Sequence, residues 1–223
     1  MNAPAAVLRK SSTDETHDPF WRREWPWTLL IILAFTVLTR ASQFGSPVAH
    51  VDEEFYLYVG RAILGGQLPY VDVWDRKPIG LFLIYAGIAA LGGDGVVQMH
   101  LVAGLFAALT AFVISRIANR FAQFPGGLFA GVVYLMMLPV LSGGTGQSPV
   151  FYNLFMATAA LLVVRSLQEP ETSFTRTRAV LAMLLVGLSI SVKQTALFEG
   201  CWFGLAFLYV DWRSSSSLSH TLV

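Results

Sequence analysis

Three consecutive carboxylates, those of Asp52, Glu53 and Glu54, follow the first long apolar run of the sequence, residues 27–44. A carboxylate at the boundary of a hydrocarbon layer is partly removed from water, and such a group can serve as a general base. The same residues also suit the start of a helix, with Asp52 as the N-cap and the two glutamates beside the positive end of the helix dipole. The residues alone leave both interpretations open.

A second group of charged side chains lies further along the same polar segment. It consists of Asp72, Asp75, Arg76 and Lys77 in the stretch LPYVDVWDRKP. Arginine offers a planar fork and lysine a compact charge to a phosphate, so these two cations can hold a phosphorylated substrate. The alternative is a surface cluster in which acids and bases neutralise one another.

The residues between these two groups predict a short helix that lies on the membrane. Residues 55–64 have a helix-forming composition with Tyr56, Val59 and Ile63 on one side, and Gly65 and Gly66 end the pattern. Residues 78–91 are apolar but short for a membrane span, so we expect them to lie in the outer interface or to re-enter the membrane.

Two further features each allow a functional and a purely structural interpretation. Residues 143–149, GGTGQSP, form a glycine-rich segment without the lysine of a phosphate-binding loop, and we interpret it as a turn. Lys193 lies between two apolar runs, where an ionisable residue is a functional candidate by default. A lysine that extends its stem to the membrane surface is the competing account.

The composition predicts an all-α polytopic membrane protein. Hydrophobic residues make up 55% of the 223 residues and charged residues only 13%, against roughly a quarter charged in soluble domains. The net charge of +1 and the lack of a basic aromatic cluster argue against nucleic acid as a partner. The single Cys201 excludes an intrachain disulfide, and no Cys/His spacing indicates a metal site.

Six membrane spans are predicted, with the N-terminus in the cytoplasm because Arg22 and Arg23 precede the first apolar run. We expect a cytoplasmic tail and anchor at residues 1–26, a transmembrane unit at 27–212 with an external loop at about 45–95, and a polar tail at 213–223. The spans are residues 27–44, 96–115, 126–141, 151–167, 179–192 and 196–210. This topology places Arg116, Arg120 and Arg165 on the cytoplasmic side.

The order of motifs resembles the GT-C glycosyltransferases of the protein O-mannosyltransferase and aminoarabinose transferase type. The matching features, in chain order, are the pair Asp52 and Glu53 after the first span, the aromatic Tyr56, the segment GGQLPYVD at residues 65–72, the motif WDRKPIG at residues 74–80, and VKQT at residues 192–195. Together they extend over about residues 25–212. The resemblance implies a GT-C-like bundle with amphipathic helices in the first external loop.

The resemblance also implies an activity at the outer face of a bacterial inner membrane. A sugar would pass, with inversion, from a polyprenyl-phosphate donor to a lipid, glycan or protein acceptor, and surrounding membrane lipid would be a further partner. Asp52 would be the general base, Lys77 would contact the donor phosphate, and Arg76 would assist it. The matching positions Glu53, Tyr56, Asp72 and Asp75 are assigned to substrate binding.

Several features keep other expectations open. Many relatives carry an acidic residue in the second external loop, where this chain has Gln147 and Ser148. No metal or cofactor is required, although the external carboxylates can hold a divalent cation weakly. Family members are usually longer, so a truncated copy or a non-catalytic fragment is one alternative. A lipid or solute transporter, with Lys193 lining a path, is another.

Overall fold

A computed structural model describes residues 20–46, 51–123, 125–141, 143, 145–170 and 175–221. These residues form eight α-helices and one short 3₁₀ helix, and they contain no β-strand. The predicted tail at residues 1–19 lies outside the described residues. The helices are α1 (Phe20–Arg40), α2 (Val51–Leu64), α3 (Ile79–Ala90), α4 (Val96–Ala118), α5 (Gly126–Val140), α6 (Ser148–Gln168), α7 (Thr175–Val192) and α8 (Ala196–Thr221), and the 3₁₀ helix is η1 (Ala41–Gln43).

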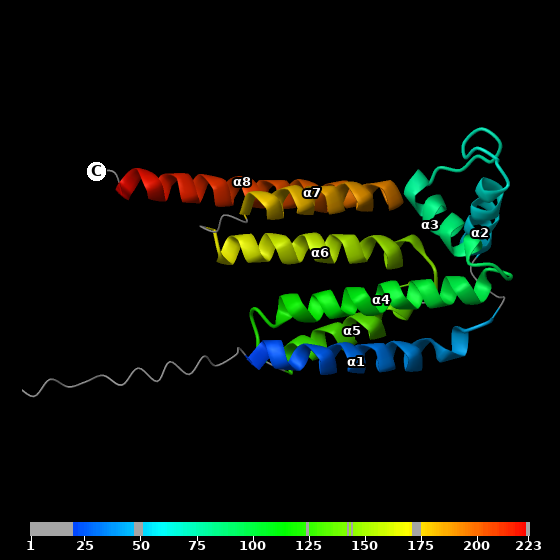
Figure 1. Cartoon of the computed structure of the whole chain (residues 1–223), viewed down its shortest axis with the longest axis horizontal. Helices are drawn as coiled ribbons and strands as arrows, with labels where there is room; N and C mark the ends of the chain where they lie inside the picture. Colours follow the sequence, from blue (N-terminus) through cyan, green and yellow to red (C-terminus); the bar gives the residue numbers. More distant parts are fainter. Residues whose placement is uncertain are drawn as a thin grey trace, which may run out of the picture.

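Six of the helices run lengthwise beside one another, and the other two lie across one end of the bundle. Figure 1 shows α1, α4, α5, α6, α7 and α8 extending in the long direction, with α2 and α3 together at the right-hand end. Helix α4 packs against α1, α5 and α6, and α6 packs against α7 and α8. We call the end that carries α2 and α3 the α2/α3 end.

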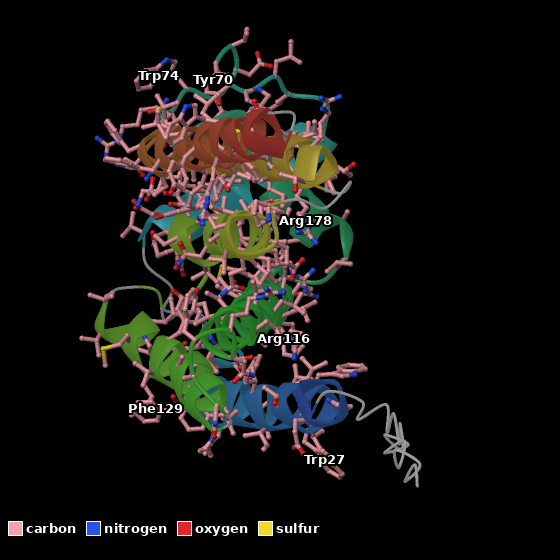
Figure 2. All side chains as sticks on the ribbon, turned by 90° about the vertical axis from the view of Figure 1, so that its left-hand side faces the viewer. Trp27, Tyr70, Trp74, Arg116, Phe129 and Arg178 are labelled. Carbon is pink, nitrogen blue, oxygen red and sulfur yellow. The ribbon has the colours of Figure 1, made fainter. Side chains whose placement is uncertain are left out.

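Four helical segments are long and apolar enough to cross a membrane. They are Glu24–Gln43, Val96–Ala118, Ser148–Gln168 and Thr175–Val192, which correspond to four of the predicted spans. Large apolar side chains on the outside of the bundle fit a lipid environment. Trp27 on α1 is 62% exposed and Phe129 on α5 is 69% exposed, and both project away from the bundle in Figure 2. The other two predicted spans are helices α5 and α8, and their crossing of a membrane stays a prediction.

The three acidic residues lie at the start of helix α2, as one of their two interpretations predicted. The helix starts at Val51 rather than at residue 55, and the predicted placement of Glu53 and Glu54 in its first turn is confirmed. Asp52 is therefore the second residue of the helix, and its predicted role as the N-cap is wrong. Acidic side chains are favourable in a first turn because they face the positive end of the helix dipole. The predicted end of the helix is confirmed, since α2 stops at Leu64 and Gly66 has a φ of +87°.

Close backbone contacts attach α2 and α3 to each other and to the bundle. A Cβ atom on Gly60 of α2 would stand 2.6 Å from the carbonyl carbon of Tyr85 on α3, so only glycine allows this approach. Gly80 at the start of α3 packs in the same way against the backbone of Ser191 near the end of α7. Tyr56 and Val59, predicted to share one face of the helix, are both buried. These contacts fix the direction in which the first turn of α2 points.

Replacing Gly60 with alanine is expected to destabilise the protein, because the new methyl group overlaps the α3 backbone. Overpacking of this kind typically costs about 1–3 kcal/mol. Gly87→Ala is the matched control, since a Cβ on Gly87 would meet open space and alanine is the better helix former by about 1 kcal/mol. Thermal unfolding in detergent, followed by circular dichroism, should show a lower midpoint for Gly60→Ala alone. Equal midpoints for the two variants would contradict the close packing of α2 on α3.

Candidate functional site

The chemistry-bearing residues singled out from the sequence gather at the α2/α3 end. Three segments contribute to this region: the first turn of α2, the loop of residues 65–78 between α2 and α3, and the loop of residues 141–147 between α5 and α6. In Figure 1 the 65–78 loop extends beyond the ends of the long helices.

The carboxylates of Asp52 and Glu53 point in different directions. Consecutive residues of a helix are turned by roughly 100° about its axis. Asp52 is exposed, whereas Glu53 is fully buried at 0% exposure. Partial removal from water at the membrane boundary was expected of the three carboxylates alike, and within the protein itself it is Glu53 that is buried. The exposed carboxylate is accessible to a substrate, and the buried one is available to hold the helix in place.

Glu53 is held by partners from two other parts of the chain. The Thr145 hydroxyl donates a short hydrogen bond to Oε1 of Glu53. The positive charge of Arg40, at the end of α1, lies within electrostatic range of Glu53. Arg40 is only 5% exposed, and its Nη2 donates to the Gly143 carbonyl at 3.0 Å. A buried carboxylate needs such a hydrogen-bond donor and a nearby cation to offset the loss of water.

The loop between α5 and α6 receives a further bond from α3. The Tyr85 hydroxyl donates to the Gly146 carbonyl at 2.7 Å, and the Tyr85 ring packs against Tyr56 and Phe151 at centroid distances of 5.3 and 5.9 Å. The interpretation of residues 143–149 as only a turn is therefore incomplete, because α1, α2 and α3 all bond to this loop. An arginine within an apolar run is a functional candidate that can be recognised in a sequence. Arg40 was not among the candidates identified from the sequence.

Tyr56 occupies the centre of the candidate site. The pKa of the Tyr56 hydroxyl is raised above its ordinary value. Burial is the main cause, and the negative charges of Asp52 and Asp75 add to it. The Lys77 ammonium lies 5.9 Å from the centre of the Tyr56 ring, within the range of a cation–π interaction. Tyr56 is thus neutral at physiological pH and lies near both the Asp52 carboxylate and the Lys77 ammonium.

Loop 65–78 is shaped by hydrogen bonds from its own side chains. Oδ2 of Asp72 accepts the Leu68 N–H at 2.7 Å, and Oδ1 of Asp75 accepts the Lys77 N–H at 2.8 Å. The Tyr70 hydroxyl donates to the Lys77 carbonyl at 2.7 Å. Tyr70 has a φ of +70°, a conformation that is uncommon for a residue with a side chain. These bonds fix the backbone that carries Lys77.

The structure brings some of the predicted site residues together and leaves others apart. Asp52, Tyr56, Asp75 and Lys77 form one cluster, as the contacts around Tyr56 show. Asp72 and Arg76 are exposed. The Asp72 carboxylate accepts the Leu68 N–H and so stabilises the turn that begins at Leu68.

The cations of the loop do not neutralise its acids by direct pairing. In the part of the chain that the structure describes, neither Asp72 nor Asp75 forms a salt bridge with Arg76 or Lys77. Both carboxylates accept backbone N–H groups instead.

Lys193 lies in the turn between α7 and α8. Its ammonium stands 5.5 Å from the centre of the Tyr152 ring on α6. Because Gly80 packs on Ser191, the start of α3 lies beside this turn. Lys193 is therefore a further cation at the α2/α3 end, in addition to those of Arg40, Arg76 and Lys77.

The described residues contain no group of three or more His, Cys, Asp or Glu side chains arranged to hold a metal ion. The available groups are an exposed carboxylate, a neutral phenol and a lysine. Such a set can accept a proton from a hydroxyl and stabilise a phosphate charge.

Comparisons of this chain with protein-family models, curated proteins and solved structures give no match.

Removing the Thr145 hydroxyl is expected to destabilise the α2/α3 end, because buried Glu53 then loses a hydrogen-bond donor. Hydrogen bonds to charged groups contribute about 1.5–3 kcal/mol, and Thr145→Val should lower the free energy of unfolding on that scale. Thr158→Val is the control, since the Thr158 hydroxyl donates only to Leu154 on its own helix. Denaturant unfolding in detergent measures both. A Thr145→Val protein as stable as the control would show that Glu53 does not depend on this contact.

Proposed function

We propose that the chain is a membrane glycosyltransferase of the GT-C type, which transfers a sugar from a polyprenyl-phosphate donor to an acceptor hydroxyl. The observation that carries the proposal is the cluster around Tyr56, where exposed Asp52 and the Lys77 ammonium both lie near one tyrosine. The motif order described above, from Asp52 to the VKQT segment, supports it. A base and a phosphate-binding cation at one end of an apolar bundle suit a lipid-linked substrate.

Asp52 is the general base in this reaction. Its carboxylate takes the proton of the acceptor hydroxyl while the acceptor oxygen forms a bond to the anomeric carbon of the sugar. The bond between that carbon and the phosphate oxygen breaks, and the polyprenyl phosphate leaves with the electron pair. Attack from the face opposite to the leaving group inverts the anomeric configuration.

Lys77 stabilises the charge that develops on the departing phosphate, as a fixed cation does best in a site with little water. Its backbone is held by Asp75 and Tyr70, and its ammonium by Tyr56. Arg76 is exposed next to Lys77. Its planar guanidinium group helps to bind the single phosphate of the donor. Asp72 and Asp75 act mainly by shaping the loop.

Glu53 is a positioning residue. It does not reach the substrate, because it is fully buried, but its bond with Thr145 sets the rotation of α2. The rotation of the helix in turn determines where Asp52 points.

The topology that fits this function has six spans, with α2 and α3 at the outer face of a bacterial inner membrane and the N-terminus in the cytoplasm. Arginines concentrate at the end of the bundle opposite α2 and α3, where Arg116, Arg120, Arg165 and Arg178 lie close to one another. Basic residues at the ends of spans favour the cytoplasmic side. Helices α2 and α3 then contact the outer interface and its lipid.

Asp52→Asn is expected to abolish sugar transfer, because an amide cannot accept the acceptor proton. A general base contributes about 10²–10⁴-fold in rate, so the transfer of labelled sugar in membranes that express the variant should fall at least a hundredfold. Glu54→Gln is the matched control, as Glu54 is exposed in the same helix turn and should retain activity. Equal losses in the two variants would contradict the assignment of Asp52, and no transfer by the unaltered chain from any polyprenyl-phosphate sugar would refute the proposed function.

Lys77→Gln is expected to weaken donor use, because the phosphate loses its cation. One hydrogen bond between charged groups contributes about 1.5–3 kcal/mol, which corresponds to roughly ten- to a hundredfold in kcat/KM for the donor. Lys77→Arg retains the charge and should keep more activity than the glutamine variant. Steady-state transfer at varied donor concentration separates the effects, and an unchanged donor kcat/KM in Lys77→Gln would exclude Lys77 from phosphate binding.

A further inference from the structure

A cavity of about 320 Å³ lies at the end of the bundle opposite α2 and α3. Its walls come from the last turn of α4, the residues that follow it, and the last turn of α6. The lining residues are Arg116, Asn119, Arg120, Arg165, Gln168 and Glu169. Figure 2 looks at this end of the molecule, and Arg116 and Arg178, both labelled, lie there with other nitrogen-bearing side chains between them.

Among the residues that the structure describes, more arginines than carboxylates line this cavity. Three arginines and one glutamate line it, and Arg178 of α7 adds a fourth cation beside Glu169. The Glu169 carboxylate is shared, since it lies 2.9 Å from Nη2 of Arg178 and 3.5 Å from Nη1 of Arg120. These arginines lower the pKa of Glu169, mainly through the bond with Arg178. The Glu169 carboxylate therefore contacts two guanidinium groups, those of Arg120 and Arg178.

Donor atoms in the cavity region lack an acceptor. Nε of Arg165 and Nη1 of Arg178 are buried, and within the described parts of the chain neither has a hydrogen-bond partner. Arg165 also lies within electrostatic range of Arg116, Arg120 and Arg178. Buried guanidinium groups that repel one another and retain unused donors are costly unless an anion joins them.

The depth of the cavity indicates the kind of anion. Arg116 and Arg165 stand in the last turns of α4 and α6, both of which are long and apolar enough to cross a membrane. The ends of such helices lie where the hydrocarbon layer gives way to the headgroups. A phosphate group is present at that depth in every phospholipid, and arginine binds phosphate through paired N–H donors.

We propose that this cavity is a phosphate-binding site, occupied by the headgroup of an anionic phospholipid. Arg165, which lines the cavity, supplies an unused donor, and Arg116, Arg120 and the neighbouring Arg178 supply positive charge. The site is separate from the cluster around Tyr56, and the proposal does not depend on the proposed function.

Retention of phosphatidylglycerol by the purified chain tests the proposal. Native mass spectrometry in detergent counts bound lipid for the unaltered chain and for Arg165→Gln, with phosphatidylcholine as the zwitterionic comparison. We expect a retained phosphatidylglycerol, little phosphatidylcholine, and about tenfold weaker binding in the variant, which is the scale of one lost hydrogen bond to a charged group. Arg213→Gln is the control, because Arg213 is exposed on α8 and does not line the cavity.

A second probe separates the two sources of phosphate. If inorganic phosphate raises the thermal stability of the unaltered chain but not of Arg165→Gln, while lipid retention is equal in both, the site binds phosphate from solution rather than from lipid. If Arg165→Gln does not fold, Arg120→Gln replaces it, since the Arg120 side chain is 25% exposed. The proposal would be overturned if the folded variant and the unaltered chain retained the same amount of lipid and were stabilised equally by phosphate.

Discussion

The burial of one carboxylate at the end of an apolar bundle is the constraint on which the arrangement of the α2/α3 end depends. Glu53 is removed from water, and this is tolerable only because Thr145 donates to it and Arg40 carries a positive charge nearby. Those partners come from segments that are far apart in the sequence. Satisfying Glu53 therefore brings together the end of α1, the first turn of α2 and the loop between α5 and α6.

The same constraint explains why charged and aromatic residues cluster where they do. With α2 rotated so that Glu53 faces inward, Tyr56 lies one turn along on the buried side, and its ring meets Lys77 and Tyr85. Asp52 is left on the exposed side. Gly60 allows α3 to pack directly on α2. The site is thus a consequence of helix rotation and close packing, and no single loop creates it.

The sequence predicted the helical, membrane-type architecture because apolar length is a local property that can be read without knowledge of the fold. The end of α2 at Gly65 and Gly66 followed from the same local reasoning. Which carboxylate is buried could not be predicted, since Asp52 and Glu53 are adjacent and are distinguished by contacts with distant segments, such as the bond from Thr145 to Glu53. Arg40 was hidden within an apolar run, and its acceptor, the Gly143 carbonyl, is a backbone atom that leaves no trace in the sequence.

The alternation of exposed Asp52 and buried Glu53 makes the spacing between the first turn of α2 and Gly60 a determinant of register. One residue inserted or deleted within the helix, between Glu53 and Gly60, would turn the first turn by roughly 100° relative to Gly60 and exchange the environments of neighbouring carboxylates. Gly60 opposes such a slip, because the residue that took its place against Tyr85 would carry a side chain. Gly60 thus fixes the rotation of α2 about its own axis. Substitutions in α2 that keep this rotation should be tolerated better than those that change it.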